Sequence, residues 1–175
     1  MKKFIITIFS LLLLLQINTY IANASKNDFE KFYYDIGYKD ISNALLDSNK
    51  HYKTNISLPS QLPEVSFTHA FGRLNDLEGE ENDGLEFEFI NENSPHNHYK
   101  ILINPIAHKL PFEEKHIKQK VKLKDGSEAV FSKTFTDFNT LVFEKNGWQY
   151  ILSMDQESEK KITMENLIEI ANSVK

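Results

Sequence analysis

The spacing of hydrophobic residues predicts helices at both ends of the chain. Apolar side chains recur every three or four residues over residues 27–37, which predicts a helix that stops at Gly37. A second short helix is expected from Asp40, ending before the polar residues 48–50. A third is expected over residues 163–174, with its apolar positions on one stripe: Met164, Leu167, Ile168, Ala171 and Val174.

Between these helices the hydrophobic period changes to two, which is typical of half-buried strands. Single strands are expected near residues 65–71, 85–89 and 99–103, and two hairpins over residues 121–131 and 141–152. The hairpin turns are Asp125-Gly126 and Asn146-Gly147. The predicted fold is α+β: a curved antiparallel sheet of about six strands in meander order, with N-terminal helices and a C-terminal helix on one face.

The first 24 residues have the pattern of a signal peptide. Lys2 and Lys3 precede a short apolar run over residues 4–15, and Ala22-Asn23-Ala24 offers a cleavage site. We expect cleavage after Ala24 and secretion with no stable membrane anchor, although an uncleaved anchor is the alternative. Residues 25–50 are then a helical segment of one globular domain with residues 51–175. Without the two lysines the formal net charge changes from −5 to −7.

Composition excludes several classes of function. The chain has no cysteine, so it has no thiol nucleophile, thiolate metal site or lipid-modified cysteine, and its stability depends on packing. Nucleic-acid binding is disfavoured because the exported chain is acidic and its lysines have no interleaved aromatic side chains.

Four segments, in their order and spacing, carry a resemblance to a known family: LPSQLP, VKLKDGSEAVF, LVFEKNGWQYILS and ITMENLIEIANSV. Over residues 40–175 the chain resembles a domain family of unknown function found in Gram-positive secreted proteins, lipoproteins and the extracytoplasmic parts of anti-sigma factors. That resemblance implies a half-barrel similar to that of periplasmic lipoprotein carriers. It also implies no catalytic residues.

Two groups of side chains are candidates for ligand binding. In a carrier-like fold an apolar chain or peptide could lie against the sheet, with these residues as lining candidates: Phe67, Phe71, Phe87 and Phe89. The alternative is an ordinary filled core. A row of lysines, expected on one face of a strand, could bind anionic polymer or lipid headgroups: Lys118, Lys120, Lys122 and Lys124. Its alternative role is to protect a sheet edge from aggregation.

His96 and His98 are the candidate metal ligands, because imidazoles two residues apart on an extended segment point to the same side. A solvated polar loop is the alternative. Seven acids between Asp76 and Glu88 do not fit a calcium-binding EF-hand, since Gly79 and Ile90 would occupy its first and twelfth positions. We therefore expect a solvated acidic loop and a strand whose Glu86 and Glu88 face water.

No nucleophile elbow, zinc-protease motif or phosphate-binding loop occurs in the sequence. The prediction is a secreted, non-enzymatic binding or regulatory module at the bacterial cell envelope, with no cofactor and with a polymer, lipid or protein as partner. The alternative is a small secreted hydrolase acting on cell-wall or host polymer. It would need a carboxylate pair that the sequence alone does not single out.

Overall fold

The computed structural model describes residues 28–76 and 83–175. The chain forms two compact units, residues 1–37 and a sheet domain, Tyr38–Lys175. In the first part, residues 28–35 are helical, as predicted, and Gly37 follows with φ at 94°. Docking of this helix on the sheet stays a prediction, and the expected signal peptide, residues 1–24, lies outside the described residues. Among the described helices, none is both long and apolar enough to cross a membrane.

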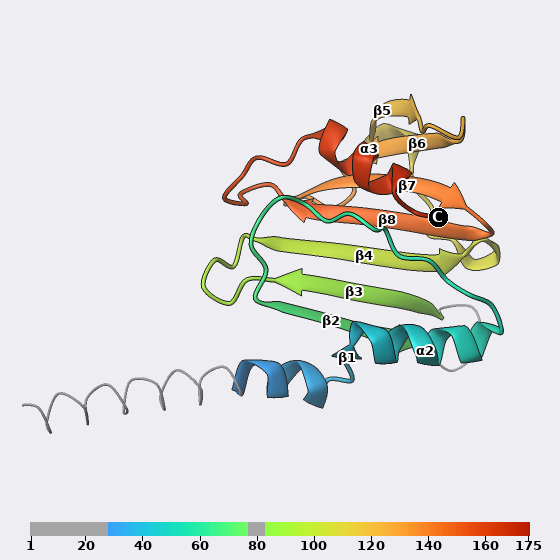
Figure 1. The fold of residues 1–175 in the computed structure, drawn as a ribbon. Helices are drawn as coiled ribbons and strands as arrows, with labels where there is room; N and C mark the ends of the chain where they lie inside the picture. The colour runs from blue at the N-terminus through green and yellow to red at the C-terminus, as the bar shows by residue number, and fades with distance from the viewer. Residues whose placement is uncertain (1–27, 77–82) are drawn as a thin grey trace, which may run out of the picture. The chain divides into compact units, whose positions relative to one another are not determined.

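The sheet domain contains one open antiparallel sheet. Its strands are β1 (Lys39–Asp40), β2 (His69–Asn75), β3 (Gly84–Ile90), β4 (His98–Pro105), β5 (Ile117–Lys122), β6 (Glu128–Ser132), β7 (Phe138–Lys145) and β8 (Trp148–Asp155). The order across the sheet is β1-β2-β3-β4-β8-β7-β6-β5 (Figure 1). The α+β class, the antiparallel pairing and a mostly meander order are confirmed. The sheet has eight strands instead of the expected six or so, and one connection departs from the meander.

The difference in order arises between β4 and β5. The four strands β1–β4 form one meander and β5–β8 form a second, and β4 pairs with β8 instead of β5. Residues 106–116 therefore cross from the middle of the sheet to its β5 edge, through two short 3-10 turns at Ile106–His108 and Glu114–His116. Pro105 ends β4, because a proline has no N–H to donate and its ring fixes φ.

Two helices belong to the sheet domain. The first, α2 (Ile41–Tyr52), begins after Asp40 as predicted but continues past the expected end at residue 48. There the Ser48 hydroxyl donates to the Ala44 carbonyl at 2.7 Å, so this buried serine is compatible with a helix interior. The second, α3 (Met164–Asn172), begins at Thr163, where Thr163 and Asn166 form a capping box.

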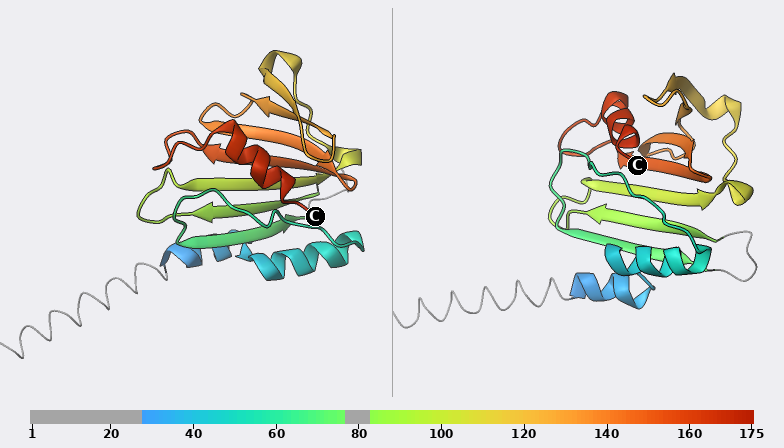
Figure 2. Two further views of the ribbon diagram at one scale, coloured as in Figure 1. Left: turned by 45° about the horizontal axis from the view of Figure 1, so that its top comes forward. Right: turned by 45° about the vertical axis from the view of Figure 1, so that its right-hand side comes forward.

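One face of the sheet is filled core. Leu167, Ile170 and Ala171 of α3 belong to the same buried cluster as Phe87 and Tyr150 on the strands. Figures 1 and 2 show α3 over the β7–β8 side of the sheet, α2 along the β2 side, and the connector after α2 running between them. The Tyr150 hydroxyl donates to the Ser57 carbonyl of that connector at 2.9 Å, and burial raises the pKa of Tyr150 to about 12.

The two hairpin turns are as predicted. Asn146 and Gly147 have φ values of 51° and 84°, the left-handed region that a tight hairpin of this type requires. Gly126 has φ at 87°, and the Asp125 carboxylate accepts from the backbone N–H of Ser127 at 3.0 Å. Hydrogen bonds from Ser127, with Lys145 nearby, lower the pKa of Asp125 to about 2.

Candidate functional site

An open groove lies on the face of the sheet opposite the α2–α3 core, which we call the second face. Its floor includes Val130 of β6 and Val142 of β7, which pair directly in register. The crossing segment supplies the wall, with Leu110, Pro111 and Phe112. The groove has a volume of about 710 Å³. This is within the roughly 300–1,000 Å³ of ordinary ligand pockets.

Gln149 of β8 holds the wall in place. Its side-chain oxygen accepts from the Leu110 N–H, and its side-chain nitrogen donates to the Leu110 carbonyl, both at 2.9 Å. Because Gln149 is buried, these two bonds meet most of the hydrogen-bonding needs of its amide. These two hydrogen bonds fix the backbone of Leu110, while the residue as a whole stays 43% exposed. The groove is therefore an apolar surface on a fixed support.

The charged part of the groove lining, its rim, consists of two opposite-sign pairs and a further glutamate, Glu128 of β6. Lys109 contacts Glu144 at 2.6 Å, and Lys120 contacts Glu114 at 2.9 Å. A hydrogen bond and the charge of Glu114 raise the pKa of Lys120. The rim therefore holds two lysines and three glutamates around the valine floor, and it has no excess of positive charge.

A network of ion pairs occupies the β2–β4 part of the same face. Glu86 of β3 lies between Arg73 of β2, at 2.6 Å, and Lys100 of β4, at 2.8 Å. Burial by itself would raise the pKa of Glu86, but Lys100 and Arg73 outweigh it and lower the pKa to about 2. Lys100 also contacts Glu88 at 2.7 Å, and His98 contacts the second oxygen of Glu88.

The expectation that Glu86 and Glu88 face water is wrong. Glu86 is 7% and Glu88 4% exposed, and every residue of β3 is buried. The alternation along β3 is as predicted, since Phe87 and the two glutamates point to opposite faces. Long cationic side chains on the neighbouring strands cover the carboxylates, an effect that depends on strand pairing and that a single strand does not reveal.

The four phenylalanines do not line one surface. Phe87 and Phe89 lie on the core face, where the Phe67 ring is 5.8 Å from that of Phe89. Phe71 pairs with Glu88, and so points to the second face. The alternation expected over residues 65–71 would place Phe67 and Phe71 on one face, but β2 begins only at His69 and Phe67 precedes it. The core-face phenylalanines are covered by packed side chains, and a ligand-binding role for the four stays a prediction.

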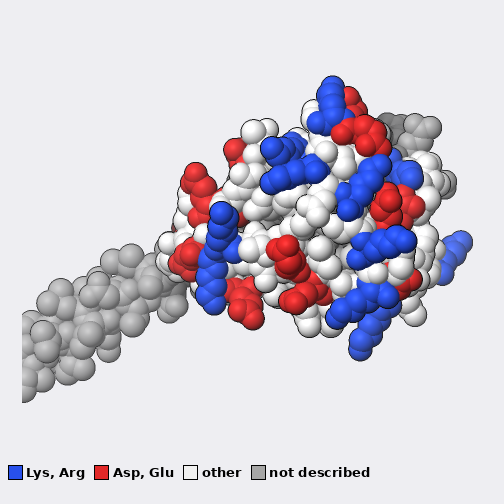
Figure 3. Space-filling model, turned by 90° about the horizontal axis from the view of Figure 1, so that it is seen from above, with Lys and Arg blue, Asp and Glu red and all other residues white. Residues whose placement is uncertain are grey.

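The lysines do not form one row either. A bulge between Ile117 and Gln119 interrupts the alternation at Lys118, whose ammonium lies 5.5 Å from the centre of the Phe131 ring on the core face. Lys120 and Lys122 point to the second face, whereas Lys124 lies in the turn after β5. Figure 3 shows lysines and acids interspersed on the face seen from the β5 side. Binding to anionic surfaces stays a prediction.

His96 and His98 engage different carboxylates. The two ring nitrogens of His96 lie 3.2 Å from Asp155 and 3.5 Å from Glu157, whereas His98 faces Glu88. His96 precedes β4 and His98 begins it, so the two side chains do not share the regular alternation of one strand. A shared metal ion stays a prediction. Of the predicted acidic loop, residues 77–82 lie outside the described residues.

Sequence reasoning missed the groove, because its wall belongs to the crossing segment and its floor to β6 and β7, and only the fold brings the two together. The available signal was the stretch from Pro105 to Phe112, which keeps apolar residues between two prolines in a charged loop. Nothing in this pattern indicates which strands the segment crosses.

The comparisons with known proteins add no relative, since no family model, no curated protein and no solved structure matches the chain.

Proposed function

We propose that this protein is an exported, non-enzymatic binding module of the bacterial cell envelope, and that the groove on the second face holds an apolar peptide segment of a protein partner. The observation that carries the proposal is the exposed apolar wall of Leu110, Pro111 and Phe112, fixed above a valine floor. Export and envelope location rest on the signal-peptide pattern and on the family resemblance.

Two features favour a peptide over the other expected partners. The two lysines of the rim are each paired with a glutamate and the rim holds a third glutamate, so it offers an anionic polymer or lipid headgroup little net attraction. The groove is also open, so a long acyl chain lying in it would stay partly in water. An extended peptide lying in the groove can direct alternate apolar side chains to the valine floor, while the side chains between them point away from it.

A hydrolase acting on envelope polymer is the competing proposal, with groove glutamates as its acid and base. A general acid or base must be able to reach the bond that it cleaves. Glu114 and Glu144 are each held in an ion pair with a lysine, at 2.9 Å and 2.6 Å, and would have to leave that lysine to reach a substrate. The ion pairs therefore favour binding over hydrolysis.

The proposal is tested by selecting peptides from a random library on the purified protein and measuring their affinity by fluorescence polarisation. We expect apolar peptides, and an affinity about tenfold or more weaker for Leu110→Asp, since a charge on the wall must lose water on binding. Leu46→Asp is the matched control, because Leu46 is an exposed leucine on α2, away from the groove, and should bind as the unchanged protein does. Equal binding by Leu110→Asp would contradict the proposal, as would selective binding of a fluorescent fatty acid with no peptide selected.

A further inference from the structure

A second cluster, unrelated to the groove, lies where α2, β2 and β3 come together. Asn75 pairs with Gly84 at the last rung of the β2–β3 ladder, so the residues just beyond it, Asp76 and Asp83, lie on adjacent strand ends. The last turn of α2 places His51 beside them. Its Nε2 is 3.0 Å from Asp83 and its Nδ1 is 3.9 Å from Asp76.

These three side chains meet the distance requirement for sharing one ion. Each offers one ligand atom, and the three atoms lie within 4.8 Å of one another. Within residues 28–76 and 83–175, such a set of three occurs at His51 and at neither His96 nor His98. His96, like His51, has one carboxylate against each ring nitrogen, but its ligand atoms and those of Asp155 and Glu157 do not all lie within that distance of one another.

The electrostatics of the cluster favour a cation. The Asp83 side chain is only 4% exposed, and a second carboxylate lies close to it. The C-terminal end of α2 adds a partial negative charge at the same place.

A polar atom next to the cluster also lacks a partner. The Tyr52 hydroxyl is buried and makes no hydrogen bond within the described part of the chain. The Tyr52 ring lies edge-on to His51, with 4.7 Å between ring centres. A tyrosine hydroxyl carries one O–H donor, which needs an acceptor when it is buried. A water or anion on a bound metal is the kind of acceptor that such an orphaned donor lacks.

We propose that His51, Asp76 and Asp83 bind a divalent transition-metal ion of the zinc class. Zinc accepts one imidazole nitrogen with carboxylate oxygens, whereas calcium takes oxygen ligands. Three protein ligands leave a fourth position open for water or another ligand. A bound ion would link the C-terminal end of α2 to the end of β2 and the start of β3. The proposed metal site does not depend on the proposed peptide binding.

Calorimetric titration of the chelator-treated full chain with zinc chloride tests the site. We expect one equivalent to bind with micromolar or tighter affinity. His51→Gln and Asp83→Asn each remove a ligand, so the loss should reach or exceed the roughly 10- to 100-fold that an outer-shell change costs. His96→Gln is the matched control, since His96 also lies between two carboxylates, and it should leave zinc affinity unchanged.

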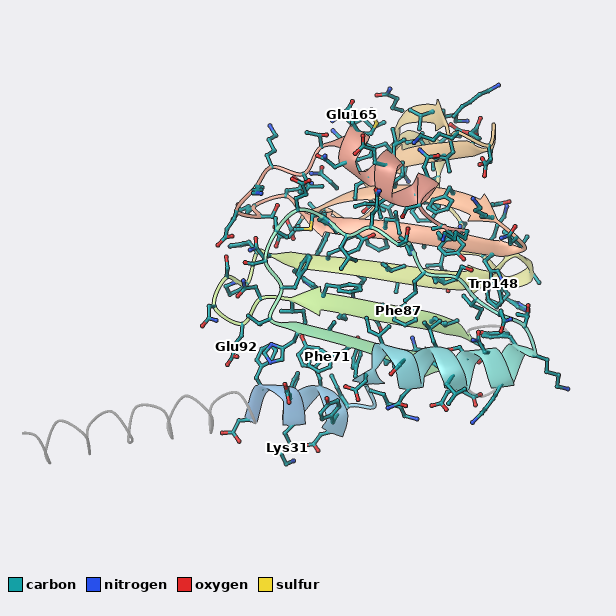
Figure 4. All side chains as sticks on the ribbon, viewed as in Figure 1. Lys31, Phe71, Phe87, Glu92, Trp148 and Glu165 are labelled. Atoms are coloured by element: carbon teal, nitrogen blue, oxygen red, sulfur yellow. The ribbon has the colours of Figure 1, made fainter. Side chains whose placement is uncertain are left out.

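The position of the ion can be checked independently with Trp148, the single tryptophan of the chain. Its ring centre is 4.8 Å from that of Tyr52, which in turn contacts His51. Trp148 pairs with Pro105 at one end of β4, whereas His98 begins the other end, about 23 Å away at strand spacing. Figure 4 shows Trp148 and Glu92 at opposite ends of the sheet. One equivalent of Co²⁺, which quenches indole emission at short range, should therefore quench Trp148 strongly, and His51→Gln should abolish that quenching.

Each result supports or overturns the proposal. Absence of zinc binding at micromolar concentration would overturn it, as would unchanged affinity in His51→Gln or quenching that persists in that variant. Loss of zinc binding in His96→Gln would also overturn it, because the metal would then bind at His96, at the other end of the sheet. Circular dichroism verifies that each variant is folded. If buried Asp83→Asn fails to fold, His51→Gln and Asp76→Asn, both at more exposed side chains, decide the question.

Discussion

At the scale of single residues, the buried carboxylates of β3 show how neighbours change the role of a charged side chain. Glu86 has two cationic partners on the adjacent strands, and its pKa is lowered from 4.5 to about 2. Because the carboxyl pKa is lower in the folded protein, the ion pairs stabilise the fold at pH values above the carboxyl pKa of the unfolded chain. This stability is lost as the pH falls from about 4.5 towards about 2.

Glu86→Gln should therefore lower the free energy of unfolding by about 3 kcal/mol at pH 7, because it leaves Arg73 and Lys100 without their shared partner. At pH 2 the difference should shrink to about 1 kcal/mol or less, since the carboxyl is then about half protonated in the folded protein and almost fully protonated in the unfolded chain. Urea denaturation at the two pH values measures both quantities. Glu113→Gln is the control, because the Glu113–Lys115 pair is exposed and should change stability by no more than about 0.5 kcal/mol. An equal loss at both pH values would disprove the electrostatic explanation.

At the scale of elements, the packing of α2 on β2 depends on the absence of a side chain. A Cβ atom built on Gly72 would lie 2.7 Å from the Phe87 ring and 2.8 Å from the Ala44 Cβ of α2. Both neighbours are almost fully buried, so neither has free space to move into. Gly72 thus sets how closely helix and sheet approach.

Gly72→Ala should lower the free energy of unfolding by about 1–3 kcal/mol through overpacking, which thermal or urea denaturation would measure. Ala70→Val is a suitable comparison, because Ala70 is exposed on the same face of the same strand. Although valine adds more volume than alanine does at Gly72, its effect should stay within about 0.5 kcal/mol. If the two substitutions cost the same, close contact at Gly72 is not what limits the packing.

At the scale of the whole molecule, the pairing of β4 with β8 joins two meanders into one sheet. Both strands are flanked on each side, and Ile101, Ile103, Ile151 and Leu152 are fully buried. By contrast, β5 lies at the edge and pairs with β6 alone. The stability of backbone hydrogen bonds should therefore fall from the centre of the sheet towards β5.

Native-state hydrogen exchange measures this gradient. Amides of β4 and β8 should exchange only with global unfolding, whereas those of β5 should exchange through local opening, at a free energy lower by about 2 kcal/mol or more. Protection of β5 equal to that of β4 would contradict the gradient. It would also indicate that another chain covers this edge in solution, since lysines at an exposed edge otherwise discourage pairing.

The sequence by itself determined the local elements. Hydrophobic spacing located both helices of the sheet domain and most strands, and Asn146-Gly147 placed a tight turn, because these features depend on neighbours within a few residues. Strand order, the bulge at Lys118 and the burial of Glu86 depend on which distant segments pair. For the same reason only the tertiary structure brought the groove wall to its floor, and His51 to Asp76 and Asp83: contacts between residues far apart in the chain are decided by the packing of the whole sheet.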